Sequence, residues 1–319
     1  MVESKPSQSA DTQTAPKRAV CFVNPNARAA QDRTDAFVAA LESQGVSVTL
    51  NWTESREAAL DQIDALAETE AILVGGGDGT ISGLLPSLLK RPEPIGILPL
   101  GTANDFARSL SIPADPQAAA AVIAGGHRVA VDTGMVGDRP FLNVVSLGIS
   151  VEIAGMHEDG AKKLLGRFAY PIRWSEAWRR HRPLRLEIDV DGEKRRARCS
   201  LLGVGCGRHY GGGLTLDEQA KLNDGLLHLY YVAPKHALHW VRFLPGLWRG
   251  TLRRTDGAFT AKGREVSIAV LGGKRKKVNA DGEIVAETPV TVSVRPQSLT
   301  VFAPDDAPEE VLAEVLEQH

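Results

Sequence analysis

A glycine-rich stretch after an apolar run constrains this chain most: Ile72-Leu73-Val74-Gly75-Gly76-Gly77-Asp78-Gly79-Thr80. Apolar residues then resume at helical spacing, at Ile81, Leu84, Leu85, Leu88 and Leu89. The pattern predicts a buried strand, a tight turn and a helix. Glycines let a ligand approach the backbone closely, and the amides at a helix N-terminus favour phosphate. We therefore predict a phosphate site made by Gly75, Gly76, Gly77, Gly79 and Thr80. The alternative is a plain strand-to-helix turn in which Thr80 caps the helix.

A second stretch has the same pattern, a short strand followed by a loop that contains glycine. The short strand Ile95-Gly96-Ile97-Leu98 runs into Pro99-Leu100-Gly101-Thr102-Ala103-Asn104-Asp105-Phe106-Ala107-Arg108. Together, GGGDGT and PLGTANDFAR resemble the diacylglycerol kinase catalytic domain. This family of soluble bacterial lipid kinases also includes the eukaryotic diacylglycerol and sphingosine kinases. NAD kinases and phosphofructokinases share a loop similar to the first motif, whereas the second motif separates the lipid kinases from them.

Length and composition are those of an ordinary globular protein. The chain has 319 residues, 43% of them hydrophobic and 24% charged, which suits two domains better than one. The net charge of −2 gives no overall attraction to nucleic acid. No apolar run approaches the roughly 20 residues that span a bilayer, and the N-terminus has no apolar signal core. Cys21, Cys199 and Cys206 are widely spaced, as is typical of reduced thiols. These features predict a cytoplasmic protein.

Basic residues gather in three places, at 179–182, 195–196 and 274–277. Such clusters are ordinarily solvated faces. The alternative is contact with an anionic membrane surface. With a lipid substrate, the protein is expected to associate transiently and peripherally with the inner face of the membrane. The sequence does not indicate an oligomeric state.

The first half alternates strands and helices. Residues 1–17 have the composition of a disordered tail. We predict strands at 18–23, 46–50, 71–74 and 95–98, and helices at 32–44, 54–68 and 80–90. This alternation specifies a parallel sheet with helices on both faces. Because ligands bind at the carboxyl ends of such strands, Asn24, Thr53, the glycine-rich stretch and Thr102 are expected to share one nucleotide site.

The second half reads differently, as many short strands with glycine turns. The predicted strands are 129–131, 139–145, 184–190, 198–204, 226–232, 265–270 and 290–294, with helices at 156–180 and 235–251. This pattern favours a β-sandwich. The resemblance implies an α/β nucleotide-binding domain, similar to that of NAD kinases and phosphofructokinases, at 18–133. Residues 299–319 complete this α/β domain. The resemblance also implies a β-sandwich domain for the lipid substrate at 134–298.

Asp78 lies inside the glycine-rich stretch without a neighbouring base. Beside phosphates, a carboxylate is suited to hold Mg²⁺, which neutralises charge on the transferring phosphoryl group. The alternative is a cap on the following helix. Asn104 and Asp105 either orient the nucleotide or cap a helix. In the family, Asn-Pro is usually followed by two small residues and then a basic one. Here Arg28 replaces the second small residue, so Arg28 is a candidate to supply the positive charge of that basic residue.

A third motif, Asn279-Ala280-Asp281-Gly282-Glu283, follows the basic run 274–277. Taken alone, Asp-Gly is typical of a hairpin turn. In the family, an Asp-Gly-Glu at this place supplies the catalytic acidic group, so the resemblance implies that Asp281 or Glu283 is the general base. Asn at 281 keeps the shape and the turn preference, so folding is expected to survive Asp281→Asn.

The segment Lys221-Leu222-Asn223-Asp224-Gly225-Leu226 resembles one that holds a structural Mg²⁺ in bacterial members. The resemblance implies the Asp224 carboxylate and the carbonyls of Lys221 and Leu226 as ligands. An Asx turn into a strand is the alternative.

These observations predict an ATP-dependent, Mg²⁺-dependent lipid kinase that phosphorylates a primary hydroxyl of diacylglycerol or a related lipid. An NAD kinase-like enzyme is one alternative, although its downstream Asn-Glu motif is absent. A non-catalytic nucleotide- and lipid-binding regulator is another. The sequence cannot specify the lipid, because apolar pockets tolerate many chains.

Overall fold

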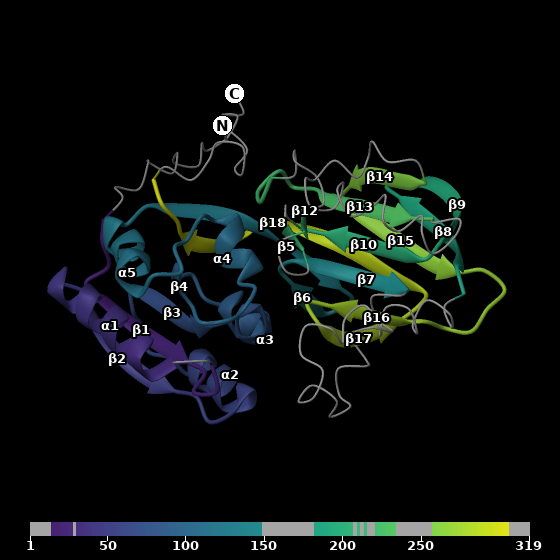
Figure 1. Cartoon of the computed structure of the whole chain (residues 1–319). Coiled ribbons are helices and arrows are strands. Elements are labelled where there is room, and N and C mark those ends of the chain that lie inside the picture. Colours follow the sequence, from purple (N-terminus) through teal and green to yellow (C-terminus); the bar gives the residue numbers. More distant parts are fainter. Residues whose placement is uncertain are drawn as a thin grey trace, which may run out of the picture.

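The computed structural model describes residues 14–27, 30–148, 182–206, 209–210, 214–215, 221–233 and 257–305. Figure 1 shows two parts side by side: an α/β part built by the N-terminal half and a β-rich part built by the C-terminal half. Each part has its own cluster of buried apolar side chains. Within the described residues, no helix is long and apolar enough to cross a membrane.

The α/β part contains a parallel sheet in the order β2 (Ser47–Trp52), β1 (Arg18–Val23), β3 (Ala71–Gly76) and β4 (Ile95–Pro99). Every residue of β3 and β4 is buried, as expected for central strands covered on both faces. The helices are α1 (Ala30–Ser43), α2 (Arg56–Asp64), α3 (Asp78–Leu88), α4 (Asp105–Ser109) and α5 (Pro116–Gly125).

Two pairs of helices cover this sheet: α1 packs against α5, and α2 packs against α3. The pairs lie on opposite faces (Figure 1). The helix α5 ends at Gly126, whose φ of 76° is left-handed. This arrangement confirms the predicted parallel sheet with helices on both faces.

Two element boundaries near the glycine-rich stretch differ from the prediction. The strand β3 continues through Gly75 and Gly76, because Gly75 pairs with both Val23 and Leu98. The helix α3 begins at Asp78, two residues before the predicted start, and Gly77 is its N-cap. The turn is therefore shorter than the sequence suggested.

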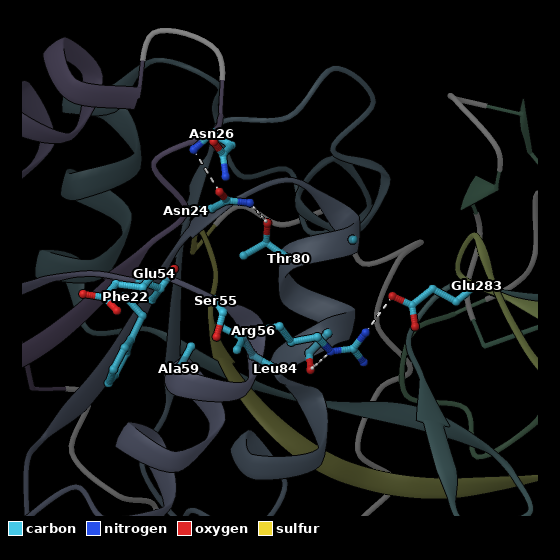
Figure 2. Close-up of a pocket in the computed structure, with 13 residues that line it drawn as sticks. Phe22, Asn24, Asn26, Glu54, Ser55, Arg56, Ala59, Thr80, Leu84 and Glu283 are labelled. Carbon is cyan, nitrogen blue, oxygen red and sulfur yellow. Dashed lines mark hydrogen bonds and ion pairs between the residues drawn. The ribbon is translucent and has the colours of Figure 1, made fainter. Parts of the chain in front are cut away.

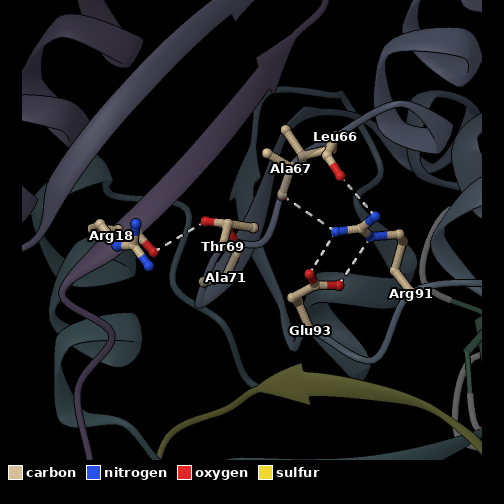
Figure 3. Close-up of polar contacts among 7 residues, drawn as sticks. All are labelled: Arg18, Leu66, Ala67, Thr69, Ala71, Arg91 and Glu93. Atoms are coloured by element: carbon tan, nitrogen blue, oxygen red, sulfur yellow. Dashed lines mark hydrogen bonds and ion pairs between the residues drawn. The ribbon is translucent and has the colours of Figure 1, made fainter.

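The helix predicted at 54–68 covers only Arg56–Asp64. It starts late because Ser55 is its N-cap and accepts a hydrogen bond from the amide of Ala58. Beyond its end, Arg91 donates to the carbonyl of Leu66 at 3.0 Å and to Glu93 from Nε at 3.0 Å and Nη2 at 2.5 Å (Figure 3). Glu93 is 8% exposed, and its bidentate pair with Arg91 holds the guanidinium in place within the turn before β4. The bond from Arg91 to Leu66 then ties the segment after α2 to this turn.

One long strand joins the two parts. The strand β18 (Val290–Phe302) pairs with β15 (Glu265–Val270) through its first half, and Val301 pairs with Ile95 of β4. It also pairs along both halves with β5 (Arg128–Val136). The chain therefore returns to the α/β sheet through the last residues of β18. Residues 306–319 lie outside the described residues.

The second part is an antiparallel sandwich, which confirms the predicted fold class. One layer continues the first sheet through β18 and β15 to β8 (Leu184–Val190) and β9 (Glu193–Cys199). The other layer has the order β14 (Ala258–Gly263), β13 (Leu227–Val232), β10 (Leu201–Gly205), β7 (Val144–Gly148), β16 (Lys277–Ala280) and β17 (Glu283–Glu287). A separate small ribbon pairs β11 (His209–Tyr210) with β12 (Leu214–Thr215).

The predicted strands 129–131 and 290–294 are too short, since they are parts of β5 and β18. Two other predicted strands each divide into two. The segment 139–145 divides into β6 (Arg139–Phe141) and β7, and 198–204 divides into β9 and β10. In both cases the chain changes sheet, so no single strand can continue. The strands β14, β16 and β17 were not predicted. The helices predicted at 156–180 and 235–251 lie outside the described residues.

Candidate active site

A pocket of about 220 Å³ lies at the carboxyl ends of β1, β2 and β3. Its lining combines residues that follow these strands with residues of α2 and α3 (Figure 2). Asn24, Thr53, Gly79 and Thr80 line it, as the shared nucleotide site required. Glu283 also lines it, although Glu283 belongs to the sandwich. The pocket therefore has walls from both parts of the molecule.

Hydrogen bonds between neighbouring loops order the polar side of this pocket. Asn24 donates from Nδ2 to the hydroxyl of Thr80 at 3.3 Å, and Thr53 donates to the carbonyl of Val23 at 3.1 Å. Thr80 is the third residue of α3, and Gly77 occupies the N-cap position. The alternative that Thr80 caps the helix is thus wrong.

The glycines of the first motif have different surroundings. A Cβ on Gly76 would meet Thr80 at 2.5 Å, and one on Gly77 would meet the Cα of Gly101 at 2.9 Å. A Cβ on Gly79 would meet nothing within 4 Å. Gly75 and Gly76 lie within β3 and do not line the pocket. Their lack of a side chain serves packing, and of the four glycines only Gly79 faces the pocket.

The second motif forms a loop packed against the first. Asn104 accepts from the amide of Gly101 at 2.9 Å and donates to its carbonyl at 2.9 Å. Asn104 is the N-cap residue of α4, with a φ of 49°, but its side chain makes no capping hydrogen bond to the helix and binds Gly101 instead. Gly101, Thr102 and Asn104 lie beside the pocket without lining it. Their contact with a nucleotide stays a prediction.

Asp78 joins the N-termini of two helices. Its Oδ1 accepts a hydrogen bond of 2.9 Å from the amide of Phe106 in α4. Within the described residues, no group of three or more His, Cys, Asp or Glu side chains is placed to hold a metal. A single carboxylate with a free oxygen fits a Mg²⁺ ion that keeps waters and takes its other ligands from phosphates. Asp78 would hold that ion through Oδ2.

The Asp281 carboxylate is fully hydrogen-bonded. It accepts from the amides of Leu142 at 2.7 Å, Asn143 at 2.9 Å and Val144 at 3.0 Å, and from the hydroxyl of Ser82 at 2.8 Å. Burial raises the pKa of Asp281, and these hydrogen bonds oppose the shift. Its φ of 47° is left-handed, in agreement with the predicted hairpin turn. With four donors around it, Asp281 is placed to hold the turn in position.

Glu283 has the opposite surroundings. It is 57% exposed at the start of the edge strand β17. Within the described residues, the one hydrogen bond to its carboxylate comes from Nη1 of Arg56 at 2.6 Å (Figure 2). Of the two carboxylates in the third motif, only Glu283 reaches the pocket with an oxygen available to a substrate.

Asp224 lies in a turn next to a buried histidine. Its Oδ1 accepts from the amide of Leu226 at 3.0 Å, as an Asx turn does, and its Oδ2 lies 3.1 Å from Nε2 of His228. His228 is 3% exposed, and its Nδ1 has no hydrogen-bond partner in the part of the chain that the structure describes. An ion held by the Asp224 carboxylate and the carbonyls of Lys221 and Leu226 would either share Oδ2 with His228 or compete with it for that oxygen.

A second carboxylate connects this turn to the strands that join the two parts. Asp132, 2% exposed in β5, accepts from the amide of Gly225 at 2.7 Å and from the amide of Gln297 at 2.7 Å. Burial raises the pKa of Asp132, and the two amides oppose the shift.

Sequence reasoning missed Arg56 and Ser82. Neither belongs to a motif, and each acquires its partner from the β16–β17 hairpin, about two hundred residues away. No local pattern signals such a contact. Arg28, the candidate for the family's basic residue, lies outside the described residues.

The sequence profile described as diacylglycerol kinase catalytic domain matches residues 18–136, and that described as YegS C-terminal NAD kinase beta sandwich-like domain matches 143–303. The chain belongs to the diacylglycerol kinase and YegS-like lipid kinase family. As a member, it is an enzyme of the lipid kinase class.

Curated relatives agree with this assignment. The chain is 29% identical over 303 residues to "Diacylglycerol kinase" of Staphylococcus aureus (strain bovine RF122 / ET3-1), covering 93% of this chain and 95% of the relative. It is 29% identical over 273 residues to "Probable lipid kinase YegS-like" of Klebsiella pneumoniae (strain 342), covering 84% and 90%. The fold matches a crystal structure of a diacylglycerol kinase from Bacillus anthracis str. Sterne, with a TM-score of 0.75, 24% identity, and coverage of 92% and 99%.

Proposed function

We propose that this lipid kinase transfers the γ-phosphoryl group of ATP, with Mg²⁺, to a hydroxyl group of diacylglycerol or a related lipid. The observation that carries the proposal is the position of Glu283. An exposed carboxylate of the sandwich lines the same pocket as Gly79 and Thr80 at the N-terminal end of α3. A phosphate-binding helix end and a general base thus face one space.

The chain's own residues supply the steps. The first turn of α3 binds phosphate through the amides of Asp78 and Gly79 and through the partial positive charge of the helix end. Asp78 would hold a Mg²⁺ ion, and that ion would neutralise charge on the phosphoryl group. Glu283 accepts the proton of the attacking hydroxyl. Asp281, held by four donors, fixes the turn that carries Glu283.

The proposal includes a membrane-bound substrate. Residues 274–277 and Arg195 and Arg196 are exposed, and they give the sandwich basic surface suited to anionic headgroups. We infer a cytoplasmic enzyme that associates with the membrane peripherally and transiently. This attraction is screened within a Debye length of about 10 Å at 0.1 M salt, so binding is expected to weaken as salt rises.

The test is phosphoryl transfer from radiolabelled ATP. The purified protein is incubated with Mg²⁺ and either diacylglycerol in anionic vesicles, a total lipid extract, or NAD. Labelled lipid supports the proposal, whereas labelled NADP supports the NAD kinase-like alternative. ATP binding without transfer to any acceptor supports the regulator. Sedimentation with anionic and neutral vesicles at low and high salt tests the membrane step, and equal binding to both would contradict it.

A further inference from the structure

The pocket contains one cation. Among its lining residues, all within the described part of the chain, Arg56 alone is Lys, Arg or His, whereas Glu54 and Glu283 are both acidic. A nucleotide triphosphate brings several negative charges into this space. The helix end of α3 contributes only about half an elementary charge. Without Arg56, the side chains around the triphosphate would therefore repel it.

We infer that Arg56 binds the terminal phosphate of the nucleotide and positions Glu283 beside the transferring group. This inference rests on the proposed function and adds to it a residue that no motif contains.

Two contacts hold the guanidinium in place. Nε donates to the carbonyl of Gly83 in α3 at 3.1 Å, and Nη1 donates to Glu283 at 2.6 Å. Figure 2 shows the guanidinium of Arg56 between helix α3 and Glu283. Arg56 itself begins α2, directly after the N-cap Ser55. The side chain thus spans from α2, along α3, to the sandwich.

The guanidinium retains donors for a ligand. Arginine has five N–H groups in a planar fork, and the two contacts use two of them. Nη2 makes no hydrogen bond to any residue that the structure describes, and the side chain is 34% exposed. Two parallel N–H groups match two phosphate oxygens, which is why arginine suits this task better than lysine.

The shared guanidinium places base and phosphoryl group together. In the step, the acceptor O–H bond breaks and its proton passes to Glu283. The acceptor oxygen forms a bond to the γ-phosphorus, and the bond from that phosphorus to the bridging oxygen breaks, leaving its electron pair on ADP. Arg56 offsets the charge on the phosphoryl oxygens during transfer. It is thus a phosphate ligand and a positioning residue for the base.

An ordinary surface ion pair is the competing explanation, because exposed pairs contribute little to stability. The contact with Gly83 argues against it. A Cβ on Gly83 would lie 3.2 Å from Nε, so a side chain there would crowd the guanidinium in its present position. A pair formed only by two flexible surface chains has no such close contact with a helix.

The test compares Arg56→Gln and Arg56→Lys with Lys90→Gln. Lys90 forms a 2.6 Å ion pair with Asp64, which joins the segment after α3 to α2, and it lies outside the pocket lining, so it is a matched loss of charge. Calorimetry measures the binding of ATP, ADP and AMP with Mg²⁺, and steady-state assays measure kcat and KM. Circular dichroism and thermal unfolding check that each variant is folded.

Arg56→Gln is expected to weaken ATP binding by about tenfold or more, as loss of a charged hydrogen bond does, and AMP binding by much less. Arg56→Lys restores part of the ATP affinity but not kcat, because lysine has no fork to hold both partners. Lys90→Gln behaves as the parent does.

Three results would overturn the inference. A folded Arg56→Gln with parental ATP affinity and kcat overturns it alone, while the proposed function stands. If that variant does not fold, parental kcat in Arg56→Lys overturns the positioning role. A parent that binds no ATP overturns both the inference and the proposed function.

Discussion

The hydroxyl of Ser82 donates a 2.8 Å hydrogen bond to Oδ2 of Asp281, across 199 residues of sequence. Ser82 lies in α3, whose first turn lines the pocket, and Asp281 lies in the turn of the β16–β17 hairpin. The remaining bonds of this carboxylate go to the amides of residues 142–144. One side chain therefore joins the helix of the phosphate site to two segments of the sandwich.

Removing either partner should loosen this junction. Ser82→Ala deletes one charged hydrogen bond and is expected to lower the free energy of unfolding by about 1–2 kcal/mol in urea titrations. Asp281→Asn should cost more, because its NH₂ group would face backbone N–H donors. This reverses the expectation from sequence that Asp281→Asn leaves folding intact. Ser47→Ala, at an exposed residue in β2, is the control. Equal stability of all three variants and the parent would contradict this reading.

Glu283→Gln should impair chemistry without weakening ATP binding. The amide keeps the size of the side chain but cannot accept the hydroxyl proton, and general-base assistance is typically worth roughly 10²–10⁴-fold. We expect kcat to fall by about a hundredfold or more in steady-state assays, with ATP affinity measured separately by calorimetry. Glu287→Gln, at the exposed far end of β17, is the control. Should Glu283→Gln turn over lipid at the parental rate, Asp78 or Asp105 would be the next candidate base.

The sequence predicted the parallel sheet and the sandwich because periodicity is a local property. It also located the pocket, since Asn24, Thr53 and Thr80 follow strands that must end at one edge. It could not show why these positions of the first motif require glycine. The space at Gly77 is closed by Gly101, and the space at Gly76 is closed by Thr80.

Nor could the sequence indicate which of Asp281 and Glu283 is buried among donors and which is exposed. Both are acidic and two residues apart, yet one is surrounded by donors from residues 82 and 142–144 and the other is exposed. Those partners come together only through the packing of α3 against the sandwich. For the same reason, nothing near Arg56 in the sequence indicated its contact with Glu283.

Gly77→Ala and Gly79→Ala form a matched pair. At Gly77, φ is −97°, so the conformation suits any residue and the restriction is space: a Cβ would lie 2.9 Å from the Cα of Gly101. The sequence places Gly77 in the predicted phosphate site, whereas in the structure a side chain at this position would meet the backbone of Gly101. We expect Gly77→Ala to lower the melting temperature and ATP affinity together.

Gly79→Ala should separate these two effects. Its Cβ meets nothing within 4 Å, and alanine within a helix is more favourable than glycine by up to about 1 kcal/mol. The melting temperature should therefore hold or rise, while the methyl group in the pocket lowers ATP affinity. Thermal unfolding and calorimetry on both variants check this, and a loss of stability in Gly79→Ala alone would refute it.

Asp224 should govern any response of stability to divalent ions. An ion that binds only the folded state stabilises it by mass action, so added Mg²⁺ should raise the melting temperature of the parent but not of Asp224→Ala. His228→Gln keeps the carboxylate and removes the imidazole from Oδ2, so its response to Mg²⁺ should exceed that of the parent. Because imidazole suits Zn²⁺, whereas carboxylates and carbonyls suit Mg²⁺, Zn²⁺ is the comparison ion. If neither Mg²⁺ nor EDTA changes the parental melting temperature, Asp224 serves only as a partner of His228 and Leu226.

The three cysteines should make stability fall at alkaline pH. Cys21, Cys199 and Cys206 are all buried, and burial raises the pKa of Cys21 and of Cys199 to about 12 from 9.0. Between these values the folded state keeps protons that the unfolded state releases. The stability that these thiols contribute is therefore complete below about pH 9 and is lost as pH rises toward 12, by about 1.4 kcal/mol per pH unit for each thiol. Urea titrations from pH 8 to 11 should show this slope, and Cys21→Ala should reduce it by one thiol's share.

Because the reactive form is the thiolate, Ellman's reagent at pH 8 should label none of the three in the native protein and all of them in urea. Rapid labelling of the native protein, or an unchanged slope in Cys21→Ala, would show that these thiols are accessible and titrate normally.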